Sequence, residues 1–191
     1  YTDATAAAYY FARTEKLRNE TFLVINAGET LGATVVQMQN GRKFNILESH
    51  VYPVFVGKML DDLIFKYAIS KFVKANKNRT GDITLKKIEE LKGKCVEAKR
   101  TLIKSEKTEI TVYDFQGETD LNVRIERSDL EMEADDIITM VIELLEKFDA
   151  NKITKVILSG LTSKQQFIKD QVSSMFDEEN IYYEEFGEVA L

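Results

Sequence analysis

The dipeptide Asn40-Gly41 gives the strongest local structural signal in the chain, because it lies between two short segments rich in apolar and β-branched residues. A type I′ turn needs positive φ at both central residues, and Asn-Gly adopts it readily. We therefore expect a hairpin joining strands at Ala33–Met38 and Lys43–Ser49. A further strand is expected at Phe22–Asn26, before a turn at Ala27–Gly32. Together these segments predict a three-stranded antiparallel meander.

Helical and strand patterns alternate after the meander. Apolar residues at three- and four-residue steps predict four helices: from Met59 to about Lys77, from a cap at Thr84 through Leu102, over Glu131–Phe148, and through Phe167 to Phe176. Strand patterns predict a hairpin of Glu109–Phe115 with Leu121–Arg127 around Gly117, and a short buried strand at Lys155–Leu158. This order of elements indicates the α/β class. We expect residues 1–55 and 134–191 to form an α/β core subdomain that carries an inserted helix-and-hairpin subdomain at residues 56–133.

Charge is unevenly distributed along the chain. The formal net charge is -6, yet residues 66–108 hold 13 Lys and Arg against 5 Asp and Glu. This basic block indicates either a surface that faces phosphate or a solvated helix face. It has no regularly spaced aromatic residues to stack on bases, and the whole chain is acidic, so we expect no nucleic-acid partner.

Composition excludes several classes of protein. The single cysteine, Cys95, excludes an internal disulfide framework. One cysteine and one histidine, His50, leave few ligands for a zinc site. The lone histidine also gives little basis for a Ser-His or Cys-His triad. No apolar run is long enough to span a membrane, and no signal peptide is visible, which leaves the compartment open between the cytoplasm and the endoplasmic reticulum lumen. Because the sequence begins without an initiator Met, we expect a piece of a longer protein.

Three short motifs each have a plain and a functional interpretation. The turn between Gly28 and Gly32 is either an ordinary hairpin turn or one that aims backbone N–H groups at a phosphate. Ser159-Gly160 is either a simple strand-to-helix connection or a turn that lets a ligand approach the backbone. Lys99 and Arg100 are either surface charges or a pair that brackets a base, ribose or phosphate.

The order and spacing of these motifs resemble a known family. The chain resembles the second lobe of the ATPase domain of the seventy-kilodalton heat-shock chaperone family, which has the actin-like ATPase (ribonuclease H-like) fold. Thr2–Ala8 resembles the family's NEPTAAA segment, and the glycine turn of the meander resembles DLGGGTFD. Cys95–Leu102, read as CVEAKRTL, closely matches CERAKRTL. Ile125–Glu131 resembles ITRARFE, and Val156–Thr162 resembles VLVGGST.

The resemblance implies a function and a set of binding residues. It implies a molecular chaperone that uses ATP or ADP with magnesium, held between this lobe and a first lobe that is missing here. The nucleotide-binding positions of the family fall on Gly28, Thr30, Lys99, Arg100, Ser159 and Gly160. The implied partners are the missing first lobe, a substrate-binding domain, and a nucleotide exchange factor or co-chaperone.

Several residues differ from the family pattern at positions that contact nucleotide or take part in hydrolysis. The hairpin aspartate is Asn26, a bulky Glu29 enters the glycine turn, and Val96 replaces a ribose-contacting glutamate. An amide is not an anionic acceptor, so metal-assisted phosphoryl transfer loses an important charge. We therefore predict no catalytic residue and no metal ligand in this lobe, degraded nucleotide contacts, and weak or lost ATP hydrolysis. The alternative is a regulatory or co-chaperone-docking module that keeps the fold without nucleotide turnover.

Overall fold

The computed structural model describes residues 3–28, 30–77 and 81–183, so Thr2 and Glu29 of the motifs above lie outside the described residues. The chain divides into two compact units. Unit 1 comprises the described parts of Tyr1–Gly57 and Asp136–Leu191, and unit 2 is Lys58–Asp135. These boundaries lie two residues beyond those expected from the sequence at both junctions.

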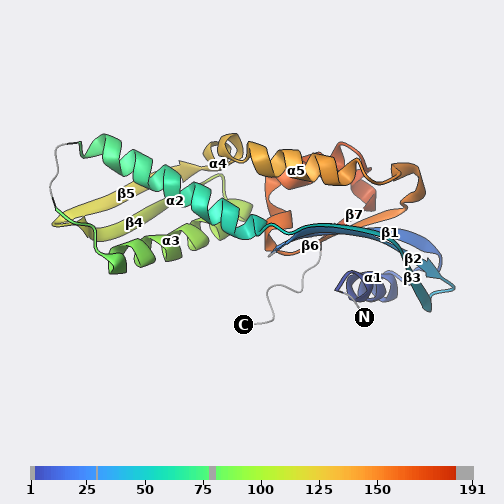
Figure 1. The fold of residues 1–191 in the computed structure, drawn as a ribbon. Helices are drawn as coiled ribbons and strands as arrows, with labels where there is room; N and C mark the ends of the chain where they lie inside the picture. The colour runs from blue at the N-terminus through green and yellow to red at the C-terminus, as the bar shows by residue number, and fades with distance from the viewer. Residues whose placement is uncertain (1–2, 29, 78–80, 184–191) are drawn as a thin grey trace. The chain divides into compact units, whose positions relative to one another are not determined.

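Unit 1 is built on a five-stranded sheet with the order β3-β2-β1-β6-β7 (Figure 1). The expected meander is confirmed: β1 (Glu20–Ala27), β2 (Leu31–Gln39) and β3 (Lys43–Tyr52) pair antiparallel in sequence order. Asn40 and Gly41 connect β2 and β3 with φ of 53° and 68°, as a type I′ turn requires. β6 (Lys155–Ser159) runs parallel to β1, and β7 (Ile181–Tyr183) runs parallel to β6.

Helices lie on both faces of this sheet, with α1 (Asp3–Thr14) along one face and α5 (Asp135–Leu145) along the other (Figure 1). Four successive residues of β1, from Phe22 to Ile25, are buried, as expected for a central strand covered on both sides. The small side chains of α1 allow the helix to pack closely on Phe22 and its neighbours in the cluster Ala7, Ala8, Ala12, Phe22, Val24, Val36, Met38 and Ile157. The α6 helix (Gln166–Ser173) completes unit 1.

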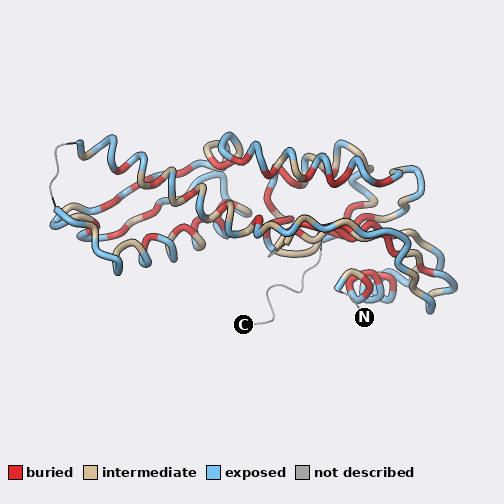
Figure 2. The backbone as a smooth tube through the Cα atoms, in the orientation of Figure 1, coloured by how far each residue is buried: buried red, intermediate tan, exposed pale blue. Residues whose placement is uncertain are grey.

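Unit 2 is a two-stranded hairpin covered by helices. It contains α2 (Val56–Ala75), α3 (Leu85–Lys104), β4 (Lys107–Gln116), β5 (Thr119–Glu126) and α4 (Arg127–Glu133). Strand β5 alternates strictly: Leu121, Val123 and Ile125 are buried while the residues between them are exposed. One face of the hairpin is therefore a core face and the other is solvated. Along the helices, buried positions recur about once per turn, as Figure 2 shows.

Defined contacts at both ends fix the length of α3. Thr84 is the N-cap, with its hydroxyl accepting from the Lys87 N–H, as the sequence predicted. At the other end the guanidinium of Arg127 donates to the carbonyls of Leu102 at 3.0 Å and Ser105 at 3.2 Å. A cation that pairs with terminal carbonyls also complements the negative end of the helix dipole.

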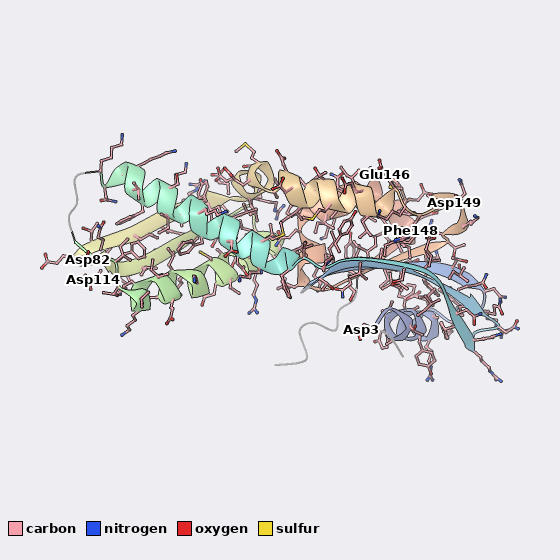
Figure 3. The ribbon with its side chains drawn as sticks, viewed as in Figure 1. Asp3, Asp82, Asp114, Glu146, Phe148 and Asp149 are labelled. Atoms are coloured by element: carbon pink, nitrogen blue, oxygen red, sulfur yellow. The ribbon has the colours of Figure 1, made fainter. Side chains whose placement is uncertain are left out.

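Three elements differ from the expectation. The predicted helix over Glu131–Phe148 is two helices, α4 and α5, that meet at Ala134, and Phe148 lies beyond the end of α5 (Figure 3). α4 starts early because Asp129 and the backbone of Glu126 form a capping box. Helix α1 and strand β7 were not predicted as such. No helix in residues 3–28, 30–77 and 81–183 has the length and apolar character needed to cross a membrane.

Candidate functional site

Two turns of unit 1 meet because β1 and β6 run parallel. Asn26 is paired with Ser159 in the register, so the chain leaves both strands at the same edge of the sheet. Ligands bind at such carboxyl-terminal edges in α/β sheets. The strand register thus brings together four of the six predicted binding residues: Gly28, Thr30, Ser159 and Gly160.

The backbone at Gly160 leaves no room for a side chain. Its φ is +86°, and a Cβ at this position would lie 2.7 Å from the Ala27 carbonyl oxygen and 2.9 Å from Oδ1 of Asn26. The same Asn26 oxygen would lie 3.4 Å from a Cβ at Gly28. The Asn26 amide therefore lies between the two glycine turns and holds the position that the resemblance assigns to an aspartate.

Hydrogen bonds close both turns. The Gly28 N–H donates to the Thr30 carbonyl at 3.1 Å, and the Gly28 carbonyl accepts from the N–H of Gly57 at 3.1 Å. In the second turn, the Ser163 hydroxyl donates to the Gly160 carbonyl at 2.7 Å. The N–H of Gly28 already donates to a carbonyl. A ligand at the first turn would therefore contact the α-carbon of Gly28, where there is no side chain.

A shallow cavity of about 260 Å³ opens beside these turns. Asn26, Thr30 and Ser159 line it, and Asp3 at the start of α1 (Figure 3) also contributes. The register explains the composition of the wall, because Val24, Thr34 and Ser49 lie opposite one another on the same face of β1, β2 and β3. Complete small-molecule sites have volumes of about 300–1,000 Å³. The cavity is therefore smaller than a complete small-molecule site.

The described residues around this cavity do not provide the ligands for a metal ion. Among them, Asp3 is the one carboxylate in its wall. Across residues 3–28, 30–77 and 81–183, no group of three or more His, Cys, Asp or Glu side chains is arranged to hold a metal. Magnesium requires oxygen ligands, preferably carboxylates or phosphates, in octahedral geometry. The described residues of this chain therefore do not supply a magnesium site of their own.

The other two predicted residues, Lys99 and Arg100, are neighbours on α3 of unit 2 but have different surroundings. Arg100 is exposed to solvent. Lys99 is buried, with 7% of its surface exposed, and its ammonium lies 2.8 Å from Oδ1 of Asp61 on α2. Lys99 is therefore part of an internal ion pair, whereas Arg100 is accessible to a ligand.

Asp61 also influences Cys95, which lies one helical turn before Lys99. The thiol is fully buried, and burial, with a smaller contribution from the Asp61 charge, raises the pKa of Cys95 to about 12. The thiol therefore stays protonated at physiological pH. Asp61 was not among the residues predicted from the sequence. It lies three residues before Ile64 and seven before Ala68, which are both buried. This spacing places its carboxylate beside the inner face of α2 and could have indicated it.

Comparison with known proteins identifies the family. The Hsp70 protein family matches residues 2–182 of the chain. The chain belongs to the Hsp70 family. Its sheet and helices form the actin-like ATPase lobe expected from the sequence. The chaperone protein DnaK of Carsonella ruddii (strain PV) is 26% identical over 195 residues, covering 92% of this chain. This Hsp70 chain spans 31% of the length of that relative.

Proposed function

We propose that this chain is the second lobe of the ATP-binding domain of a divergent Hsp70-type chaperone, with weak nucleotide binding and weak or lost ATP hydrolysis. The observation that carries the proposal is the meeting of Gly28, Thr30, Ser159 and Gly160 at one edge of the sheet beside a cavity. In the full-length protein, ATP or ADP would bind between this lobe and a first lobe.

Each residue has a role that its position supports. Gly28 lets a phosphate approach the backbone, because it carries no side chain. Gly160 lets the second turn pack against the Ala27 carbonyl and so brings that turn to the same edge of the sheet. Thr30 and Ser159 line the cavity, and the hydroxyl of Thr30 is able to donate a hydrogen bond to a phosphate oxygen. Arg100, exposed on α3, supplies a planar cation that pairs with phosphate or stacks on a base.

Hydrolysis is expected to be weak because of the amide at Asn26. A magnesium ion neutralises phosphate charge in phosphoryl transfer, and it relies on anionic protein groups to hold it or its water ligands. Asn26 offers a neutral amide at the centre of the two turns. We therefore assign no catalytic residue to this lobe.

The proposed partners follow from the family. They are a first lobe, a substrate-binding domain, and a nucleotide exchange factor or co-chaperone. Nucleotide would bias the closure of the two lobes and so signal to the substrate-binding domain. A second candidate function, a docking module without nucleotide turnover, is favoured by one observation, the neutral amide of Asn26 in the place of an aspartate.

Calorimetry with ADP and ATP on the full-length protein tests the proposal. We expect measurable affinity that falls in Arg100→Ala and in Thr30→Val. Lys86→Ala is the matched control, since Lys86 is an exposed cation in the first turn of the same helix. Equal losses in Arg100→Ala and Lys86→Ala would show a general charge effect. No heat of binding at saturating nucleotide would overturn the proposal and leave the docking module.

A further inference from the structure

We propose that Asn40 is a site of spontaneous deamidation, and that the segment Leu17–Asn19 protects it by holding the turn between β2 and β3 in place. The reaction needs no enzyme and converts the asparagine into aspartate or isoaspartate. Each event adds one negative charge to unit 1 and alters the turn that defines the meander. The inference does not depend on nucleotide binding.

The residue after an asparagine controls the rate of this reaction, because its backbone nitrogen is the attacking atom. Glycine leaves that nitrogen accessible, whereas a side chain on the following residue shields it and restricts the backbone rotation that the attack needs. Of the asparagines in the chain, Asn40 alone is followed by glycine. Asn40 is also exposed, so water reaches its carboxamide. Asn40 is therefore the asparagine that we expect to react first.

The reaction balances with water as its only co-reactant. The backbone nitrogen of Gly41 bonds to Cγ of Asn40 and gives up its proton, and the side-chain nitrogen leaves as ammonia. The product is a five-membered succinimide ring. Water then opens the ring at either carbonyl, which leaves aspartate when the bond to Cγ breaks and isoaspartate when the bond to the main-chain carbonyl carbon breaks.

The fold holds the attacking nitrogen away from this reaction. The Gly41 N–H donates to the Arg18 carbonyl at 2.7 Å, and the Asn40 N–H donates to Oδ1 of Asn19 at 2.9 Å. A Cβ placed on Gly41 would lie 3.5 Å from the Leu17 carbonyl oxygen, so the turn packs on this segment. Attack requires the Gly41 nitrogen to lose its hydrogen bond to Arg18 and to turn toward the Asn40 side chain.

The segment that protects the turn is itself anchored at both ends. It joins α1 to β1, and the Leu17 N–H donates to the Ala12 carbonyl at 2.9 Å. The Leu17 side chain packs against the apolar cluster beneath α1. At the other end, Glu20 is paired with Met38 in the register of β1 and β2. The turn therefore opens against a fixed support, and only molecules in which it has opened are able to react.

Formation of isoaspartate is expected to loosen the hairpin. The main chain then runs through the β-carbon of the former Asn40, which adds a backbone atom to the turn. A two-residue type I′ turn matches the twist of its strands only with normal backbone geometry. The modified chain should therefore be less stable than the unmodified one, and its turn should not return to the contact with Arg18.

The first test compares the folded chain with a synthetic peptide of residues 36–44 at the same mildly alkaline pH. Ion-exchange chromatography follows the gain of negative charge, and mass spectrometry of proteolytic fragments locates it. We expect Asn40 to be the first asparagine modified, and to react at least about tenfold more slowly in the folded chain than in the peptide, since two hydrogen bonds must break. Equal rates, or earlier modification of another asparagine, would overturn the proposal.

Asn19→Ala tests the protecting segment, because it removes the acceptor of the Asn40 N–H. We expect deamidation at Asn40 to become about two- to tenfold faster, the factor that corresponds to one hydrogen bond. Asn151→Ala is the matched control, since Asn151 is an exposed asparagine of unit 1 whose carboxamide bonds to Asp149. A rate in Asn19→Ala no higher than in Asn151→Ala would overturn the role of the segment.

Hydrogen exchange on wild type covers the case in which Asn19→Ala does not fold. Exchange of the Gly41 amide and deamidation of Asn40 both require the Gly41 N–H to leave the Arg18 carbonyl. The amide should therefore be protected, relative to the peptide of residues 36–44, by about the factor that slows deamidation. A Gly41 amide that exchanges as fast in the folded chain as in the peptide would overturn the proposal.

Discussion

Two glycines of this chain differ in whether their surroundings leave space for a side chain. Gly160 has a φ of +86° and lies against the Ala27 backbone, whereas Gly93, in the interior of α3, has no neighbour within 4 Å of a Cβ placed on it. Only Gly160 therefore requires the absence of a side chain. Gly93 occupies an exposed position of α3, where it lowers helix stability without any packing reason in the described residues.

We predict that Gly160→Ala lowers the free energy of unfolding by about 2–4 kcal/mol, from backbone strain at positive φ together with the clash against Ala27. Gly93→Ala should raise it by about 0.5–1 kcal/mol, since alanine has the higher helix propensity and reduces the freedom of the unfolded chain. Urea unfolding of both variants measures the two changes. Equal effects of the two substitutions would show that the junction of β1 and β6 tolerates a side chain.

The buried thiol of Cys95 gives the protein an alkaline dependence of stability. Burial raises the pKa of Cys95 from its ordinary value of 9.0 to about 12, so the folded protein keeps a proton that the unfolded chain releases above pH 9. This stabilisation is complete below pH 9 and is lost as the pH rises toward 12. We expect the stability of wild type to fall faster than that of Cys95→Ala between pH 9 and 11, by at most about 1.4 kcal/mol per pH unit.

Unfolding by urea at several pH values measures this difference. The native thiol should also react slowly with a water-soluble disulfide reagent at pH 8, because the thiolate is the nucleophile. Parallel pH curves for wild type and Cys95→Ala would show that another group causes the alkaline loss.

At the residue scale, the sequence indicated the turns but not the ion pair. Gly28, Thr30, Ser159 and Gly160 were predicted because they lie in recognisable local motifs, and the parallel register of β1 and β6 brings them together. The partner of Lys99 could not be predicted, since the pairing of Asp61 with Lys99 depends on how α2 and α3 pack. A contact between residues far apart in the sequence leaves no local pattern.

At the element scale, α3 depends on a residue outside the helix. Arg127 donates to the carbonyls of Leu102 and Ser105 and reaches Ile103 at 3.5 Å, and its own N–H pairs with the Glu106 carbonyl at 2.7 Å. These contacts tie the start of α4 to the end of the helix that carries Lys99 and Arg100. Arg127 thereby helps to fix the end of the helix on which both proposed binding residues lie.

Replacing Arg127 should destabilise this end of α3. We expect Arg127→Ala to lower the free energy of unfolding by about 1.5–3 kcal/mol, the usual contribution of hydrogen bonds from a charged donor. Arg127→Lys should restore only part of the loss, because one ammonium does not span the same carbonyls. The control is Arg124→Ala, since Arg124 is an exposed residue of β5 whose surface pair with Glu126 contributes little.

Hydrogen exchange locates the effect of Arg127→Ala. Amide protection should fall in the last turn of α3 and remain unchanged in β1 of unit 1. Equal losses of stability in Arg127→Ala and Arg124→Ala would contradict a specific role at the helix end.

Element types were more predictable than element boundaries. The meander, α2, α3 and the second hairpin follow from apolar periodicity and from the turn residues Asn40-Gly41. The break at Ala134 was not predicted, because the apolar pattern continues from α4 into α5. Strand β7 has three residues, too few to show a period, and its pairing with β6 gives it its conformation.

At the scale of the whole molecule, the chain leaves unit 1 after Gly57, forms unit 2, and returns at Asp136. The basic block of residues 66–108 falls within unit 2, where the acidic residues of the hairpin and α4 balance it, so the formal net charge of -6 lies on unit 1. Unit 2 also contains both members of the Asp61–Lys99 pair and both ends of the Arg127 contacts.

We predict that a polypeptide of residues 56–135 folds by itself. Its helices and hairpin share one core, in which Phe72 of α2 packs edge to face on Phe115 of β4 with ring centroids 5.1 Å apart. A chain of this length buries about 60% of its unfolded surface, which is enough for marginal stability. We expect helical circular dichroism, a cooperative urea transition, and protection of the Cys95 thiol.

The shorter polypeptide of residues 56–104 is the control. It lacks the hairpin and should not fold, because α2 and α3 then lose their apolar partner. If residues 56–135 show no cooperative transition, unit 2 is stable only within the intact chain.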